Sequence, residues 1–155
     1  MFVYADNAAT TAMSKAAAGA MLPAMQELYG NPSSLHQKGR EANMALIGAR
    51  ETVARCLNAS PKEIYFTGCG TEADNWAILE GARMGAEAGK KHIISDAIEH
   101  HAVLHTLAKL EKQGFDVTYL PVHENGLVRL EELAAAIRPD TCLVTVMFCN
   151  NEIGT

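Results

Sequence analysis

The stretch Thr67-Gly68-Cys69-Gly70-Thr71-Glu72-Ala73-Asp74-Asn75 decides how this chain is interpreted. It is rich in glycine, it follows a β-branched and aromatic run at 64–67, and it precedes a long helical pattern. A turn between a strand and a helix points free backbone N–H groups and the positive end of a helix dipole at one place, where a phosphate can bind. The turn therefore predicts an anion site, with the Thr71 hydroxyl as a further donor. Glycine spacing alone is equally compatible with a tight turn that binds nothing.

The same turn also satisfies a dinucleotide-binding pattern. Gly68, Gly70 and Ala73 match G-x-G-x-x-A, and Asp96 closes the next predicted strand, where an acid could bind a ribose. A dinucleotide domain usually begins with its glycine-rich turn, whereas here residues 1–60 precede it with helical patterns of their own. The local sequence leaves both ligands open.

From Glu63 onward, short β-rich runs alternate with longer helical patterns, which predicts a parallel sheet built from crossover units. The predicted strands are 64–67, 92–95, 117–120 and 143–148. Two of the intervening helices repeat apolar residues at intervals of three and four, at Val103, Leu107 and Leu110 and at Leu130, Leu133, Ala134 and Ile137. Because the strands are apolar on both faces, we expect helices above and below the sheet.

Residues 1–60 follow a different pattern and are predicted to form an N-terminal helical segment, with 61–155 forming the first part of the sheet domain. An Ala-rich helix is expected from about Ser14, with a bend at Pro23. A second predicted helix carries apolar residues on one side, at Met44, Ile47, Ala54 and Leu57.

Composition and charge exclude several classes of function. The 155 residues are 48% hydrophobic with a net charge of −5, so the chain can bury a core but has no basic stripe for nucleic acid or for a membrane surface. No apolar run approaches the roughly 20 residues of a membrane span, no export signal is present, and the four cysteines form no C-x-x-C pair, so we expect a cytoplasmic protein. His101 and His105 lie four residues apart, but no third ligand is in register, and we predict no metal site.

Five segments together resemble the cysteine desulfurases, a branch of the fold-type I enzymes that use pyridoxal 5′-phosphate (PLP). In chain order they are YADNAATT at 4–11, GNPSS with its following histidine at 30–36, the turn at 66–75, EHHAV at 99–103 and NNEIG at 150–154. They follow the family's order and run from end to end of the chain. The resemblance implies an α/β fold, the three-layer α/β/α large domain of PLP-dependent transferases, with a mostly parallel sheet that is incomplete at its C-terminal side.

Residue by residue, the resemblance implies a PLP site. Gly70 and Thr71 would bind the cofactor phosphate. His100 would stack on the pyridine ring as the catalytic residue, and Asn151 would hydrogen-bond the phenolic oxygen of the ring. A flat imidazole can cover a flat ring and relay protons near neutral pH, and an amide donor tunes the cofactor as an electron sink. The turn departs from the family at 68–70, where Ser-Gly-Ala or a close variant is usual, so a serine hydroxyl at position 68 is lost.

The implied activity is a PLP-dependent conversion of L-cysteine to L-alanine, with a persulfide that feeds iron–sulfur cluster or thio-cofactor assembly. The implied partners are a sulfur-acceptor protein such as an iron–sulfur scaffold, and a second copy of the chain in a homodimer. Two alternatives stay open. The chain could belong to another fold-type I PLP enzyme, an aminotransferase or a relative of selenocysteine lyase, or it could be a catalytically inactive chain that acts through a partner.

The family's chains are much longer than this one, and three functional groups are expected beyond Thr155. They are the Schiff-base lysine, the aspartate at the pyridine nitrogen and the cysteine that carries sulfur. We therefore expect an N-terminal portion that is inactive alone. The predicted strand 64–67 would also lack its neighbour, the last strand of the family's sheet, and this open edge predicts marginal stability or self-association.

Overall fold

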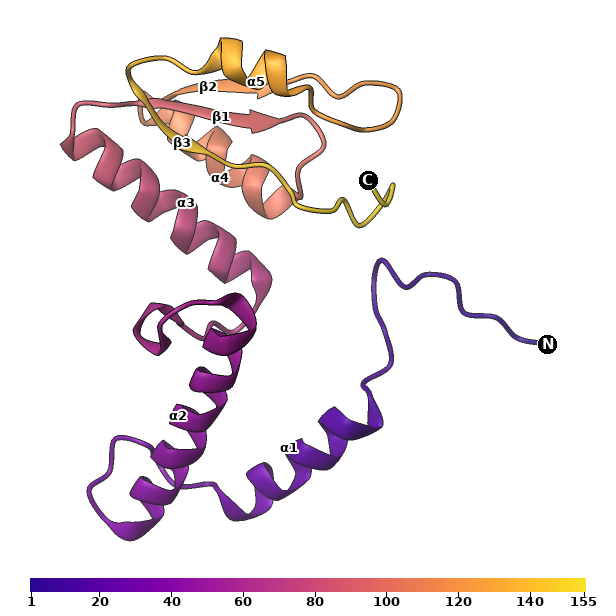
Figure 1. The fold of residues 1–155 in the computed structure, drawn as a ribbon, viewed down its shortest axis with the longest axis vertical. Coiled ribbons are helices and arrows are strands. Elements are labelled where there is room, and N and C mark those ends of the chain that lie inside the picture. The colour runs from indigo at the N-terminus through magenta and orange to yellow at the C-terminus, as the bar shows by residue number, and fades with distance from the viewer. The chain divides into compact units, whose positions relative to one another are not determined.

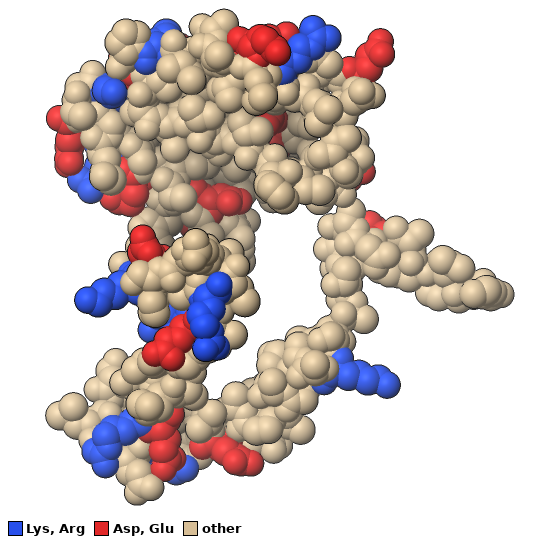
Figure 2. Space-filling model, viewed as in Figure 1, with Lys and Arg blue, Asp and Glu red and all other residues tan.

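A computed structural model describes all 155 residues, and the chain divides into two compact units, residues 1–66 and 67–155. The first unit is helical, and the second contains the sheet (Figure 1). On the face that Figure 2 displays, acidic and basic side chains are interspersed in both units. None of the helices combines the length and the hydropathy needed to cross a bilayer.

The first unit consists of α1 (Lys15–Glu27), α2 (Gln37–Leu57) and the 3-10 turn η1 (Pro61–Glu63). The predicted start near Ser14 is confirmed, because the Ser14 hydroxyl accepts a hydrogen bond from the Ala17 amide at 3.1 Å and caps α1. Pro23 lies inside α1, and the bend expected there stays a prediction. On the side of α2 that was predicted to be apolar, Ala54 is buried whereas Met44, Ile47 and Leu57 are exposed; the other buried residues of α2 are Gly39 and Ala42.

The strand predicted at 64–67 is absent, and this prediction was wrong. The capping box of Ser60 and Glu63 closes η1 immediately before this segment. The Ile64 carbonyl then accepts a hydrogen bond from Arg50 Nε at 3.2 Å, and the same guanidinium lies over the Phe66 ring. A β-strand needs a neighbour for its backbone N–H and C=O groups, and none of the other strands pairs with this segment. The unpaired strand edge on which the expectation of self-association rested is therefore not formed.

The second unit alternates helices and strands: α3 (Gly70–Glu87), β1 (His92–Asp96), α4 (His101–Lys112), β2 (Asp116–Leu120), α5 (Leu130–Ala136) and β3 (Thr141–Val144). The strand order is β2-β1-β3, and both pairings are parallel, as the alternating pattern predicted. Helices α3 and α4 lie on one face of the sheet and α5 on the other (Figure 1). This is the expected α/β/α layering.

The fourth predicted strand, 143–148, forms only in its first part, as the end of β3. Its partner β1 ends at Asp96, whose carboxylate accepts the Ile98 amide and turns the chain away from the sheet. The Thr145 amide still donates to the Ile94 carbonyl at 2.9 Å, and beyond it the chain leaves the sheet. Residues 145–149 therefore belong to no strand and lie at the carboxyl end of the sheet, where side chains can face a ligand.

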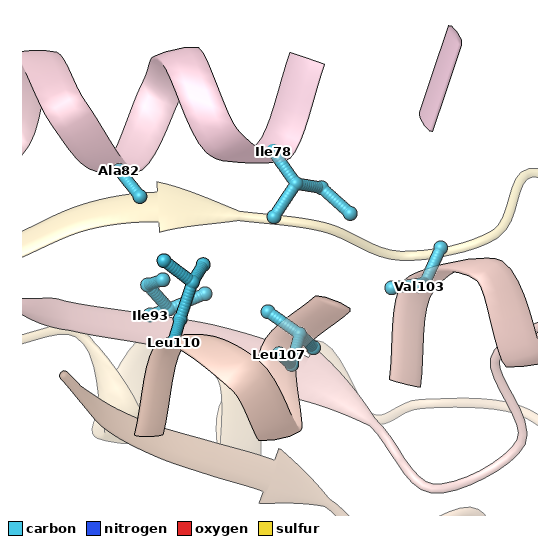
Figure 3. Packing of buried hydrophobic residues seen from close by; sticks show 6 residues of the cluster. All are labelled: Ile78, Ala82, Ile93, Val103, Leu107 and Leu110. Atoms are coloured by element: carbon cyan, nitrogen blue, oxygen red, sulfur yellow. The ribbon is translucent and has the colours of Figure 1, made fainter. Parts of the chain in front are cut away.

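The core lies between the sheet and the α3–α4 layer (Figure 3). Ile93 at the centre of β1 is fully buried against Ile78 and Ala82 of α3 and against α4. From α4, the residues predicted by their spacing point inward, namely Val103, Leu107 and Leu110. The apolar face predicted for α4 is thus confirmed, whereas α5 has no fully buried residue.

His92, the first residue of β1, links all three strands through its side chain. Its side chain is fully buried, its Nδ1 lies 2.7 Å from the Thr141 hydroxyl on β3, and its Nε2 lies 2.9 Å from the Thr118 hydroxyl on β2. Burial, followed by the positive charge of Arg138, lowers the pKa of His92, and the carboxylates of Asp116 and Asp140 oppose this shift. The imidazole is therefore held in its neutral form.

This depressed pKa predicts that the fold loses stability in mild acid. Because the pKa of His92 is lower in the folded chain than in the unfolded chain, where it is about 6.5, the unfolded chain binds more protons as the pH falls below that value. As far as His92 determines it, the free energy of unfolding should have its highest value above about pH 7 and should decrease as the pH falls through 6.5. Urea denaturation at several pH values measures this change. The neutral variant His92→Gln should lack this part of the pH dependence, and equal slopes in both proteins would contradict the assignment.

Candidate cofactor site

Four residues predicted from the sequence line one open pocket of about 430 Å³ in the second unit. They are Gly70, Thr71, His100 and Asn151. The pocket lies beyond the carboxyl end of β1, where α3 and α4 begin and where the chain leaves β3. In open parallel sheets this edge is the usual place for a ligand.

The first turn of α3 offers backbone donors to this pocket. Cys69 occupies the N-cap position, but its side chain makes no capping hydrogen bond, so the first amides of the helix have no side-chain cap. The Glu72 carboxylate accepts the Gly68 amide at 2.6 Å and fixes the turn. A Cβ added at Gly70 would meet no heavy atom within 4 Å, so the space beside its Cα is open. Uncapped amides that face open space at a helix start suit a phosphate.

His100 is the N-cap of α4. Its Nδ1 accepts a hydrogen bond from the Ala102 amide at 3.1 Å, so in the neutral ring the proton resides on Nε2. The ring is exposed and lines the pocket. The cap thus fixes the position of the ring and leaves the Nε2–H group as the donor that is available to a ligand.

Asn151 lies in the turn that follows residues 145–149, which belong to no strand. Its side-chain amide donates to the Glu152 carboxylate at 3.2 Å and is exposed. An Asn amide has two N–H donors, so one is still available to a ligand.

Two carboxylates are buried beneath the loop that carries His100. Glu99 and Asp96 are 6% and 3% exposed. Burial raises the pKa of Glu99, and the charges of Asp96 and Asp74 add to the rise, whereas hydrogen bonds from the His100 and Met147 amides oppose it. Asp96 binds the Ile98 amide at 2.9 Å and is too buried for the ribose contact that a dinucleotide would require.

Sequence reasoning missed three residues of the pocket: Asp74, Met147 and Cys149. Periodicity could have indicated all three. Asp74 lies three positions after Thr71 on α3, which places both on one helix face. Met147 and Cys149 precede Asn151 by four and two positions, and alternate residues of an extended segment face the same side.

His101 and His105 stack on the exposed side of α4, with ring centroids 5.4 Å apart and planes tilted by 10°. No group of three or more His, Cys, Asp or Glu side chains in the structure could hold a metal ion. These two rings do not line the pocket, so they offer neighbouring control positions for experiments on His100.

Fold and pocket together define a class of protein, the fold-type I PLP enzymes. A solved NifS-like protein superimposes on the whole chain with a TM-score of 0.93 at 47% sequence identity, and the match covers 42% of that protein. The model of the aminotransferase class-V family matches residues 3–155. The chain therefore belongs to the aminotransferase class-V family, and the alternative of a dinucleotide-binding domain is excluded.

Among the relatives, cysteine desulfurase IscS of Methanosarcina thermophila is 55% identical over 153 residues, which cover 99% of this chain and 38% of the relative. IscS of Neisseria meningitidis serogroup A is 54% identical over 98% of this chain. DndA from Streptomyces lividans matches with a TM-score of 0.84 at 40% identity, over 97% of this chain and 42% of DndA. The chain thus spans 38% to 42% of the length of these relatives.

The cofactor of this family is PLP, and the residues of the pocket fit it. A phosphate would accept hydrogen bonds from the uncapped amides of α3. These amides would be its main donors, because no Lys or Arg lines the pocket. A pyridine ring would find a flat imidazole at His100 and an amide donor at Asn151. The donor set therefore matches a phosphate with an attached aromatic ring.

Proposed function

We propose that this chain is the part of a PLP-dependent cysteine desulfurase that holds the cofactor. Such an enzyme converts L-cysteine to L-alanine and passes the sulfur on as a persulfide. One observation carries the proposal: Gly70, Thr71, His100 and Asn151, which come from three separate segments, line a single pocket. Identities of about 50% to relatives named cysteine desulfurase favour this activity over other reactions of the family. A further structural relative, SspA, is described in complex with cysteine.

In this proposal each residue has a definite task. The Gly70 and Thr71 amides, with the Thr71 hydroxyl, bind the phosphate at the positive end of the α3 dipole. Asn151 donates a hydrogen bond to the ring oxygen. When bound, the cofactor supplies an electron sink for the substrate.

His100 holds the proton to be exchanged. Because Nδ1 is engaged with the Ala102 amide, the neutral ring presents an N–H at Nε2 and can donate a hydrogen bond to a group above the cofactor ring. To act as an acid the ring first takes up a proton at Nδ1, which replaces the hydrogen bond from the Ala102 amide. The imidazolium then gives its Nε2 proton to that group and is left neutral, and return of the proton to Nε2 restores the imidazolium.

The proposal extends to the surroundings of the enzyme. We place it in the cytoplasm as a homodimer, with a sulfur-acceptor protein such as an iron–sulfur scaffold as its partner. The Schiff-base lysine, the aspartate at the pyridine nitrogen and the cysteine that carries sulfur are not supplied by these 155 residues and would come from the part of the relatives that this chain does not span.

Binding of pyridoxine 5′-phosphate to the chain tests the site. This compound has an alcohol in place of the aldehyde, so it cannot form Schiff bases with surface lysines. We expect saturable quenching of Trp76, which lies on α3 little more than one turn after Thr71. Thr71→Val should weaken binding of both pyridoxine 5′-phosphate and inorganic phosphate by about tenfold to a hundredfold through loss of one hydrogen bond to a charged group.

The matched control is Thr52→Val, since Thr52 is exposed on α2 and its hydroxyl bonds the Gly48 carbonyl within its own helix. This variant should bind both compounds as the parent chain does. If pyridoxine without its phosphate bound as tightly as the phosphate ester, or if NADH quenched Trp76 while the ester did not, the proposed site would be wrong.

A further inference from the structure

Asn150 ties together two segments that are far apart in the sequence. Its side chain is 6% exposed, and its Nδ2 donates to the Ile98 carbonyl at 2.9 Å, in the loop that leads to His100. Its Oδ1 accepts the amides of Glu152 and Ile153 at 2.8 and 3.1 Å. One buried amide group therefore both closes the turn that carries Asn151 and anchors this turn to the loop that carries His100.

We propose that Asn150 is a positioning residue that fixes the separation between His100 and Asn151, so that both reach the ring of one ligand. The inference rests on the proposed function, because that function assigns the ring contacts to His100 and Asn151. Asn150 does not line the pocket. It acts through its three side-chain hydrogen bonds, which hold the loop before His100 and the turn that carries Asn151.

The links do not involve the start of α3, where phosphate is expected to bind. The side-chain hydrogen bonds of Asn150 go to residues 98, 152 and 153, and to none of the turn at 67–75. Loss of the links should therefore weaken contacts to the ring while leaving contacts to the phosphate intact. A general loss of structure would weaken both, and this difference separates positioning from stability.

Two substitutions isolate the Asn150 link. Asn150→Asp keeps an oxygen that accepts the Glu152 and Ile153 amides but cannot donate to the Ile98 carbonyl. Asn150→Ser keeps a shorter acceptor without adding charge. We expect both variants to bind pyridoxine 5′-phosphate about tenfold more weakly, through loss of a buried hydrogen bond and of ring contacts, with unchanged affinity for inorganic phosphate. Exposed Asn125→Asp adds the same charge outside the pocket and should change neither affinity.

Nuclear Overhauser effects between Ile98 and residue 150 report the link in the ligand-free chain. They should be present in the parent chain and lost in both Asn150 variants, while far-UV circular dichroism stays unchanged. If the parent chain preferred the phosphate ester over inorganic phosphate and the variants kept this preference, the positioning role would be overturned. A parent chain with no such preference would overturn the proposed function instead, and persistence of the Ile98 signals in the variants would still refute the link.

Discussion

Replacing His100 with Asn should slow alanine release from L-cysteine by about 10²-fold to 10⁴-fold, the usual contribution of a positioned acid–base group. The experiment grafts residues 1–155 onto the remaining part of the Methanosarcina thermophila relative, which is 55% identical over this segment. Asn is a good N-cap residue and can replace the hydrogen bond that His100 Nδ1 makes to the Ala102 amide. The substitution therefore removes the ring and its proton while it keeps the start of α4.

Matched controls for this experiment lie on the same helix. His101→Asn and His105→Asn remove exposed imidazoles that do not line the pocket, and both variants should keep nearly full activity. Alanine formation and KM for cysteine are measured for all three. A fall in kcat with little change in KM is the expected pattern, because proton transfer occurs in the transition state. Equal losses in all three variants would show that α4 tolerates no substitution and would remove His100 from its proposed role.

The pocket could be predicted from the sequence only through several segments taken jointly. Thr71, His100 and Asn151 are individually ordinary: a helix-start threonine, a capping histidine and a turn asparagine. Their order along the chain matched one family, and the structure places them around one pocket. Asp74 was missed because the turn motif at 66–75 gives it no role, although its spacing from Thr71 puts both on one face of α3, and Cys149 was missed because it belongs to none of the five segments.

The sheet shows where local pattern fails. Runs 92–95 and 117–120 are strands because each has a neighbour, and His92 links both edges to the centre. The run 64–67 is as rich in β-forming residues, but its backbone groups find no partner strand and Arg50 takes the Ile64 carbonyl instead. Whether a strand forms depends on pairing with residues far away in the sequence, and no local pattern encodes this.

The contact of α3 with β3 predicts that replacing glycine with alanine at two positions of α3, Gly85 and Gly81, changes the free energy of unfolding in opposite directions. Gly85 is buried, and a Cβ built at this position would lie 2.6 Å from the Cys142 sulfur and closer still to the Cys142 Cβ. The strand lies directly beneath the helix here, so Gly85→Ala must push the two elements apart. We expect a loss of about 1–3 kcal/mol in the free energy of unfolding, as for other overpacked cores, even after the gain in helix propensity.

Gly81, one turn earlier on α3, is the matched control. A Cβ at Gly81 would meet only the Leu143 side chain, at 3.4 Å, which is ordinary van der Waals contact. Gly81→Ala should therefore stabilise the chain by up to about 1 kcal/mol, because alanine is the better helix former. Urea denaturation of the two variants measures the difference. Equal changes in the free energy of unfolding for the two variants would mean that α3 does not pack against β3 at Gly85. The core contacts of Ile78 and Ala82, which place the start of α3 at the pocket, would then need another explanation.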